Sequence, residues 1–143
     1  MTGPGIKRQD FKNVVYTYVV ADILHFGHLE YLRKAKELGD CLIVGVLTNK
    51  AVEEKKPTPI MTFEERIEIV KNIKYVDFAI AQSTYSPSNN VRKIRPNILV
   101  ESDSHDEMPA NNFVENYGGK VVILPYYKGQ SSTSIKKKIN ERF

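Results

Sequence analysis

The fold of this chain is decided by residues 14–28, which read VVYTYVVADILHFGH. Residues 14–20 are rich in β-branched and aromatic side chains, which is typical of a buried parallel strand. After a short loop, apolar residues recur with helical spacing from His28 to Leu38, and Gly39 is a credible end for that helix. The segment therefore predicts a strand, a loop that carries two histidines, and a helix.

The same alternation of strand and helix continues along the chain. Further strand-like runs lie at Cys41–Leu47, Val76–Ala81, Ile98–Val100 and Val121–Leu124. Helices are predicted from Thr62, from Pro87 or Ser88 towards Ile94, after Pro109 to Gly118, and over Ser131–Arg142. The charged stretch Asn49–Lys56 and the prolines after it predict a long loop. This order predicts an α/β protein with a single doubly wound sheet of five parallel strands and right-handed crossovers.

We expect one domain over residues 13–143, preceded by a flexible polar segment over residues 1–12. In a doubly wound sheet, ligands bind outside the carboxyl ends of the strands, near the point where the strand order reverses. The loops after Val20, Leu47, Val100 and Leu124 are therefore the places where a site is expected.

Composition and charge exclude several classes of protein. The chain has 143 residues, of which 41% are hydrophobic and 27% charged, as in ordinary globular proteins. No apolar run approaches the ~20 residues of a membrane-spanning helix and no secretory signal is visible, so we expect a cytoplasmic protein without a membrane partner. The net charge of +4 comes without a basic stripe interleaved with aromatics, so nucleic acid is not an expected partner. The dense run Lys136–Lys138 is expected to form a solvated helix face.

The loop after the first strand places His25, Phe26, Gly27 and His28 directly at the start of a helix. Two imidazoles three residues apart can face the same side, Gly27 lets a ligand approach the backbone, and a helix N-terminus favours an anion. We interpret the loop as a phosphate site whose N–H donors stabilise the charge of an in-line attack on phosphorus. One alternative is that one histidine packs or caps the helix while the other is exposed. The other is a metal site, for which His105 is the remaining histidine.

A second candidate phosphate site follows the fifth predicted strand. Residues 126–135 read YYKGQSSTSI, with a glycine and a cluster of hydroxyls at the start of the last helix. Backbone N–H groups and hydroxyls there could cradle a phosphate, and simple N-capping is the alternative. Both loops lie at helix N-termini on the same end of the predicted sheet, and together they favour phosphate binding.

Two runs of residues carry a resemblance to a known family: Asp22-Ile-Leu-His25-Phe-Gly27-His28, which contains an HxGH element, and Gly129-Gln-Ser131-Ser132-Thr133-Ser134-Ile135-Lys136. In this order they resemble the cytidylyltransferase-like nucleotidyltransferases, over nearly the whole chain from Val14 to Ile139. That superfamily includes cytidylyltransferases for glycerol 3-phosphate, cholinephosphate and ethanolamine phosphate, and the heptose-phosphate adenylyltransferases of lipopolysaccharide core synthesis. The resemblance implies a Rossmann-like nucleotidyltransferase fold. It also implies transfer of a nucleoside monophosphate from ATP or CTP to a small phosphorylated alcohol or sugar, with release of pyrophosphate.

The resemblance further implies roles for individual residues. The catalytic residues would be His25, His28 and Lys55. The nucleotide-binding positions would be Asp22, Gly27, Arg66, Asp103, Gly129, Ser131, Ser132 and Thr133. Mg²⁺ would accompany the nucleoside triphosphate, with no protein side chain assigned as a metal ligand, and the protein would be a homodimer.

Several positions depart from the family pattern. Val19-Val20-Ala21 stands where Gly-Thr-Phe is usual, Ser102 replaces a glycine, and Tyr126 stands where cytidylyltransferases carry an arginine. Residues 117–124 look more like the adenylyltransferases, whereas residues 60–77 look equally like the cytidylyltransferases. The choice between ATP and CTP therefore stays open. A nucleotide-binding module of the same fold without turnover is the alternative to an enzyme.

Overall fold

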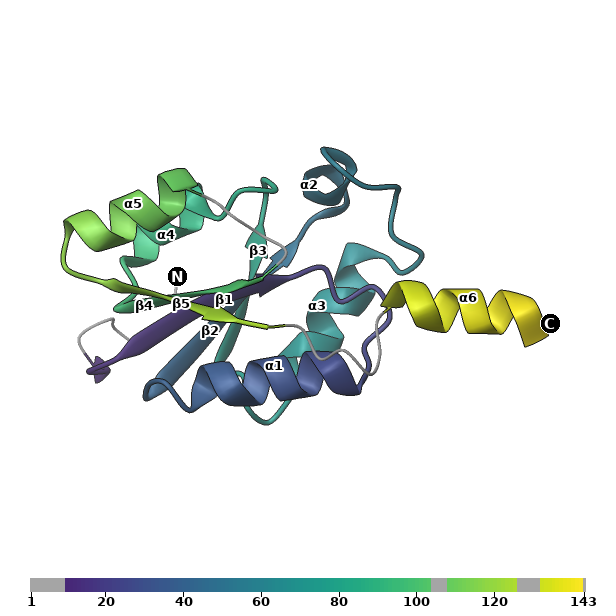
Figure 1. Cartoon of the computed structure of the whole chain (residues 1–143), viewed down its shortest axis with the longest axis horizontal. Coiled ribbons are helices and arrows are strands. Elements are labelled where there is room, and N and C mark those ends of the chain that lie inside the picture. The colour runs from purple at the N-terminus through teal and green to yellow at the C-terminus, as the bar shows by residue number, and fades with distance from the viewer. Residues whose placement is uncertain (1–9, 104–107, 126–131, 143) are drawn as a thin grey trace.

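The computed structural model describes residues 10–103, 108–125 and 132–142. Strands and helices alternate along the chain (Figure 1). The strands are β1 (Val14–Val19), β2 (Cys41–Leu47), β3 (Phe78–Gln82), β4 (Ile98–Ser102) and β5 (Lys120–Leu124). The helices are α1 (Phe26–Lys36), α2 (Asn49–Glu53), α3 (Phe63–Lys71), α4 (Ser88–Ile94), α5 (Met108–Asn116) and α6 (Ser132–Arg142).

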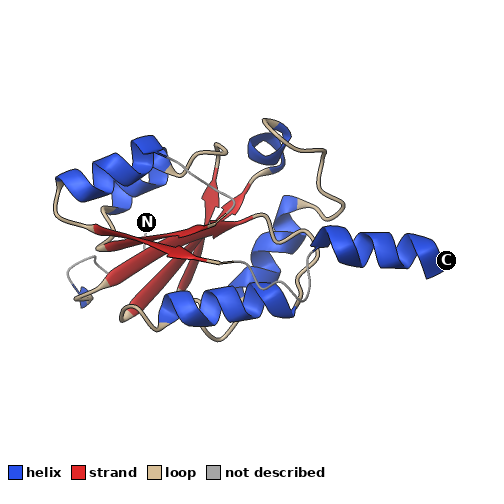
Figure 2. Cartoon of the chain, in the orientation of Figure 1, coloured by secondary structure: helices blue, strands red, loops and turns tan. Residues whose placement is uncertain are grey.

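The five strands form one parallel sheet in the order β3-β2-β1-β4-β5, with β1 at its centre. Helices cover both faces of this sheet (Figure 2). The predicted doubly wound parallel sheet is thereby confirmed. Because the chain builds outward from β1 to β3 on one side and then returns to β4 on the other, the strand order reverses between β1 and β4. The carboxyl ends of these two strands mark the place where ligands bind in such sheets.

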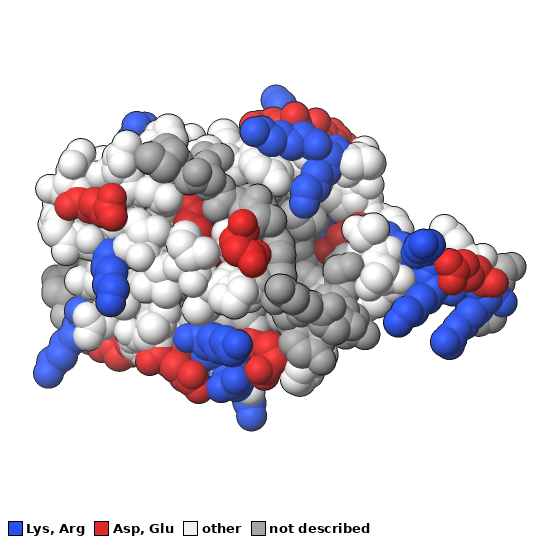
Figure 3. All heavy atoms as spheres, viewed as in Figure 1, with Lys and Arg blue, Asp and Glu red and all other residues white. Residues whose placement is uncertain are grey.

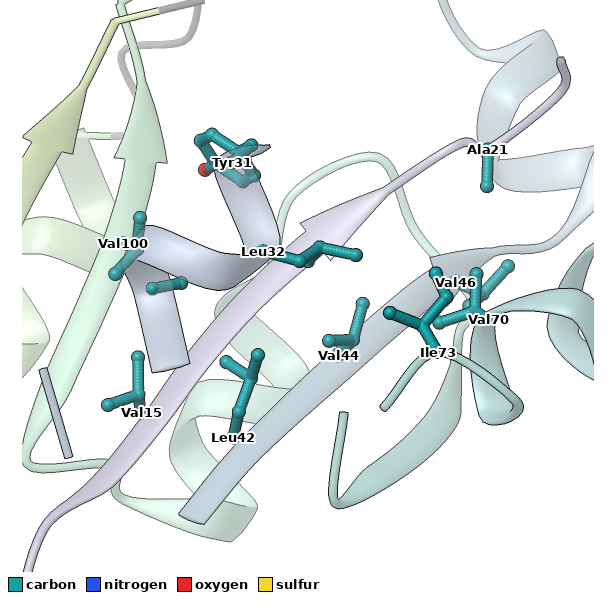
Figure 4. Close-up of a cluster of buried hydrophobic side chains, with 11 residues drawn as sticks. Val15, Ala21, Tyr31, Leu32, Leu42, Val44, Val46, Val70, Ile73 and Val100 are labelled. Carbon is teal, nitrogen blue, oxygen red and sulfur yellow. The ribbon is translucent and has the colours of Figure 1, made fainter. Parts of the chain in front are cut away.

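The core lies in two layers, one on each face of the sheet. On one face, Val15, Leu42 and Val44 pack with Leu32 of α1 and Val70 of α3 (Figure 4). On the opposite face, the neighbouring strand residues pack with α4 and α5; the buried ones are Val14, Tyr16, Cys41, Ile43, Leu99, Val91, Ile94, Ala110 and Val114. Burial on both faces explains why the inner strands read as nearly uninterrupted apolar runs.

The long loop predicted after β2 contains the short helix α2 instead. The Thr48 hydroxyl caps this helix by accepting a hydrogen bond from the Ala51 N–H at 3.1 Å. Ala51 and Val52 are buried in a small cluster with Leu47. The prediction of a continuous loop was therefore wrong, because the cap and the burial of two apolar side chains stabilise a helix in an otherwise charged stretch.

The remaining differences concern where elements begin and end. α1 begins at Phe26 rather than His28, because His25 is its N-cap. β4 continues beyond Val100 to Ser102, and its Glu101 is buried, accepting a hydrogen bond from the Tyr18 hydroxyl. α5 begins at Met108, with Pro109 inside its first turn, where proline is tolerated. Within the described ranges, no helix is long and apolar enough to cross a membrane.

Candidate functional site

Two histidines hold each other in place at the start of α1. His25 is the N-cap residue, and its Nδ1 accepts a hydrogen bond from the Gly27 N–H at 3.0 Å. Nδ1 of His28 accepts a hydrogen bond from the His25 N–H at 3.2 Å, and the two ring centroids lie 4.2 Å apart. The arrangement is a capping box in which both side chains are imidazoles. Both rings are therefore oriented by the backbone of the same turn.

The same hydrogen bonds decide which ring nitrogen carries the proton. A neutral imidazole has one N–H donor and one acceptor nitrogen, so two accepting Nδ1 atoms leave the proton on Nε2 in each ring. Burial, followed by the charge of His25, lowers the pKa of His28 from 6.5 to about 4. Burial also lowers the pKa of His25. At neutral pH the pair therefore offers two Nε2–H donors on uncharged rings.

This geometry bears on the three interpretations of the histidine loop. Capping involves both histidines, whereas the structural alternative assigned it to only one of them. Capping uses Nδ1 alone, so it leaves Nε2–H for a phosphate, and the two interpretations are compatible. For a metal site, His105 lies outside the described residues. Within the described part of the chain, no group of three or more His, Cys, Asp or Glu side chains could hold a metal ion.

A buried chain of hydrogen bonds attaches α1 to the two strands at the switch point. The Thr17 hydroxyl of β1 donates to the Val100 carbonyl oxygen of β4 at 3.1 Å. The Tyr31 hydroxyl of α1 lies 2.9 Å from the same Thr17 oxygen. These bonds hold α1, the helix that begins with the histidine pair, against β1 and β4. The pair thus lies at the carboxyl end of the sheet, as the sequence predicts.

Asp22 lies in the same loop, and its carboxylate binds two segments that are distant in the sequence. Oδ1 accepts a hydrogen bond from the Met61 N–H at 3.0 Å. Oδ2 accepts one from the Ile60 N–H at 3.1 Å and one from the Lys136 ammonium at 2.6 Å. Burial alone would raise the pKa of Asp22, but these hydrogen bonds outweigh it and hold the pKa below its usual value. Ionised Asp22 therefore joins the segment before α3 to α6.

Arg66 of α3 is fully buried, which is unusual for an arginine. Its guanidinium donates to the carbonyl oxygens of Val20 and Leu47 at 2.7 Å each and to the Met61 carbonyl oxygen at 3.3 Å. It also donates to Oδ1 of Asn49 at 2.7 Å. Val20 and Leu47 end or directly follow β1 and β2, so Arg66 clamps the carboxyl ends of these neighbouring strands. Its predicted contact with a nucleotide stays a prediction.

Known proteins match this chain in sequence and in fold. A family model described as cytidylyltransferase-like matches residues 17–138. The chain belongs to this family. Its fold is the cytidylyltransferase-like fold, as the resemblance in the sequence implies.

Individual relatives show which proteins within the family this cytidylyltransferase-like chain is similar to. It is 30% identical over 142 residues to Bifunctional protein HldE of Syntrophotalea carbinolica and 33% identical over 132 residues to that of Geobacter sulfurreducens. These matches cover 96% and 90% of this chain but 29% and 27% of the relatives, so the chain spans less than a third of their length.

Solved structures agree with this placement. A lipopolysaccharide core biosynthesis protein from Thermoplasma volcanium matches with a TM-score of 0.69 and 28% identity, over 80% of this chain and 96% of that one. A pantoate-beta-alanine ligase from Francisella tularensis, with a TM-score of 0.57 and 16% identity over 92% of this chain and 70% of that one, shows the fold alone.

The structure brings some of the predicted site residues of this cytidylyltransferase-like chain together. Asp22, His25, Gly27 and His28 share the loop between β1 and α1 and the first turn of α1. Asp22 connects this loop to α6, whose first turn carries exposed Thr133. These residues form one candidate site at the carboxyl end of the sheet.

Other predicted residues lie on other elements than the histidine pair or outside the described residues. Lys55 is exposed just after α2, and its Nζ lies 5.5 Å from the centroid of the Tyr85 ring. Asp103 is exposed directly after β4. Gly129, Ser131 and Tyr126 lie outside the described residues, and of Ser132 only its place as the first residue of α6 is described. The roles of all these residues stay predictions.

Sequence reasoning missed one residue of the site, Lys136. Basic side chains gather on α6 (Figure 3), and the prediction of a solvated face is confirmed for exposed Lys137 and Lys138. It is wrong for Lys136, because this residue forms an ion pair with Asp22. One signal was present: Lys136 follows Thr133 by three residues, so a helix presents both on the same side.

Proposed function

We propose that this cytidylyltransferase-like chain is a nucleotidyltransferase that transfers AMP from ATP to a phosphorylated sugar of the heptose-phosphate type and releases pyrophosphate. The observation that carries the transfer reaction is the pair of Nε2–H donors at the N-terminus of α1, at the carboxyl end of the sheet. The adenylyl and sugar parts rest on the relatives named HldE, on the lipopolysaccharide core biosynthesis protein and on the residues that resemble heptose-phosphate adenylyltransferases.

In the proposed reaction, an oxygen of the acceptor phosphate attacks the α-phosphorus of the triphosphate. A bond forms between that oxygen and the phosphorus, and the bond from the phosphorus to the pyrophosphate oxygen breaks. The attacking oxygen is already an anion near neutral pH, so the reaction needs no general base. Negative charge on the α-phosphate oxygens and the departing pyrophosphate is what the protein has to stabilise.

The histidine pair is suited to that task because its donors are fixed in advance. Nδ1 of each ring is engaged by a backbone N–H, so neither ring can turn without losing a cap. The two Nε2–H groups would donate to phosphate oxygens without reorganising during the reaction, and the dipole of α1 would favour the negative charge near its N-terminus. Because both rings are neutral, they donate protons in hydrogen bonds and are not expected to transfer them.

The proposal includes Mg²⁺, which would neutralise part of the charge of the triphosphate. The described residues offer no cluster of three or more ligating side chains. In the proposal the ion would be held mainly by the oxygens of the triphosphate, with water completing its coordination. No described residue is therefore assigned as a resident metal ligand.

The experiment that tests the proposal measures pyrophosphate release with ATP or CTP against a panel of acceptors. The panel contains heptose phosphate, glycerol phosphate, cholinephosphate, ethanolamine phosphate and flavin mononucleotide. We expect release with ATP and the heptose phosphate. Release with CTP and an alcohol phosphate would contradict the adenylyl and sugar parts, while leaving nucleotidyl transfer intact.

The second candidate is a nucleotide-binding module without turnover. The observation that favours it is the replacement of the usual Gly-Thr-Phe by Val19-Val20-Ala21, which removes a hydroxyl beside the candidate phosphate site. Calorimetric binding of a nucleotide by a protein that releases no pyrophosphate with any acceptor of the panel would support this candidate over the enzyme.

A further inference from the structure

Asp22 joins the loop after β1 to two distant parts of the chain, the segment before α3 and helix α6. Its Oδ1 and Oδ2 bind the backbone N–H groups of Met61 and Ile60, which fixes the segment leading into α3. Its Oδ2 also binds the ammonium of Lys136 in α6 at 2.6 Å. Asp22 and Lys136 are 114 residues apart in the sequence, so the bond connects the loop after β1 to the last helix.

The ion pair has the properties of a strong contact. The Asp22 side chain is only 9% exposed, whereas that of Lys136 is 35% exposed, so one partner is nearly removed from water. Hydrogen bonds between charged groups are about twice as strong as neutral ones, and partial burial reduces their screening by salt. This pair is therefore expected to contribute more than an exposed surface pair would.

The position of α6 makes its ion pair with Asp22 important for where the helix lies. α6 extends away from the sheet and its flanking helices, and its C-terminal end lies far from them (Figure 1). Lys137, Lys138 and Ile139 are exposed along it. Lys136 lies one helical turn after Thr133, so the Asp22 bond attaches the helix close to its first turn.

The charge of Asp22 argues against direct contact with a phosphate. A carboxylate beside a triphosphate would repel it, and both oxygens of Asp22 already accept hydrogen bonds within the protein. We propose that Asp22 is a positioning residue that acts through Lys136, seating the first turn of α6 and its Thr133 beside the histidine pair. The part of this inference that concerns nucleotide binding rests on the proposed function.

The first arm of the test needs no nucleotide. Amide hydrogen exchange is measured over residues 132–142 in the wild type and in three variants, Lys136→Met, Lys136→Arg and Lys137→Met. We expect exchange in α6 to become about tenfold faster in Lys136→Met, the change that corresponds to losing about 1.4 kcal/mol of local stability. Lys136→Arg should retain the wild-type rate because it keeps the charge. Lys137→Met is the matched control and should also be unchanged; equal exchange in Lys136→Met and Lys137→Met would overturn the proposal.

The second arm measures KM for the nucleotide against kcat, and asks whether Lys136 acts with Asp22 or independently. We expect Lys136→Met and Asp22→Asn each to raise KM about tenfold, with kcat changing less and with rescue in Lys136→Arg. The double variant Asp22→Asn/Lys136→Met should then be no worse than the poorer single variant, because both remove the same contact. A multiplied effect of about a hundredfold would show that Lys136 acts on the ligand without Asp22, and would overturn the proposal.

The two arms separate this inference from the proposed function. A wild-type protein that transfers no nucleotide would refute the proposed function, while the exchange arm would still decide whether Asp22 seats α6. Asp22→Asn also weakens the hydrogen bonds from the Ile60 and Met61 N–H groups, so its effect on α6 is not separate from its effect on folding. The exchange arm therefore uses only the lysine variants, which remove one partner on the surface of α6.

Discussion

His28 has a structural and a proposed chemical task on the same ring. Nδ1 accepts the His25 N–H, and Nε2–H is the donor assigned to the phosphates. We predict that His28→Ala lowers kcat by about two to three orders of magnitude, as expected for losing one preorganised donor, and lowers nucleotide affinity less. Steady-state kinetics with a confirmed pair of substrates, together with calorimetric nucleotide binding, checks this expectation.

Because alanine also removes a cap, His28→Gln is the matched control for folding. Glutamine is a usual third helical residue of a capping box, so it can accept the His25 N–H and preserve the start of α1. Its amide sits on a different stem and does not reproduce the position of Nε2. A kcat for both variants within a few-fold of the wild type would show that the ring has only its structural task.

The pKa of His28 makes a prediction about stability. Its value of about 4 in the folded state lies below the ordinary 6.5, so between these values the unfolded state binds more protons. The free energy of unfolding should therefore fall as pH falls through this window, by about 2 kcal/mol from pH 7 to pH 5 for this one group. Well above pH 6.5 the contribution of His28 no longer changes with pH.

Urea denaturation at pH 7 and pH 5 measures this dependence in the wild type and in His28→Gln. The variant lacks the titrating ring, so its loss of stability over the same interval should be smaller. An identical pH dependence of the two proteins would contradict the assignment of a low pKa to His28.

At the scale of the elements, Arg66 sets the shape of the edge on which the site is built. It donates to carbonyl oxygens at the ends of β1 and β2 and to Asn49 at the start of α2. We predict that Arg66→Met lowers the free energy of unfolding by about 2–4 kcal/mol, because the buried carbonyl oxygen of Leu47 and the partly buried one of Val20 lose their donor while the side chain keeps a similar volume. Denaturant unfolding measures the change.

Arg92→Met is the matched control for this substitution. Arg92 lies on the exposed surface of α4, where its guanidinium is 5.9 Å from the ring of Phe113. Its replacement should change stability by less than about 1 kcal/mol. Equal effects of the two substitutions would mean that the clamp at the strand ends contributes little.

At the scale of the whole molecule, the five strands and their parallel arrangement could be predicted, because a parallel sheet buried on both faces gives strands that are nearly continuous apolar runs in the sequence. α2 could not, because its five residues are stabilised by the Thr48 cap and by a cluster formed with Leu47 and Tyr85. The histidine loop could be recognised as a site. Which ring nitrogen faces the ligand could not, since it depends on side-chain rotamers, and the partner of Lys136 lies 114 residues away.

The preference for one nucleotide over another is also a property of the whole molecule, because we expect several loops to contribute groups that contact the base. We predict that the protein binds ATP with Mg²⁺ and is not a strict cytidylyltransferase, since Tyr126 stands where those enzymes carry an arginine. A site whose buried polar groups are left unpaired by the wrong base rejects it strongly. Calorimetric titration with ATP and CTP, each with Mg²⁺, measures the preference. A hundredfold preference for CTP, about 2.7 kcal/mol, would contradict the prediction.

The mutual cap of His25 and His28 has a consequence for how this loop is inherited. Each ring stabilises the first turn of α1 whether or not any reaction takes place there. In a related protein without catalytic activity, replacing either histidine by a residue that cannot cap would still destabilise the start of α1. Selection for folding alone can therefore preserve both histidines. The presence of both histidines in a sequence is therefore evidence for a capped helix before it is evidence for catalysis. Exposed positions without a cap to maintain, such as Lys55, are where enzymes and their inactive descendants should diverge first.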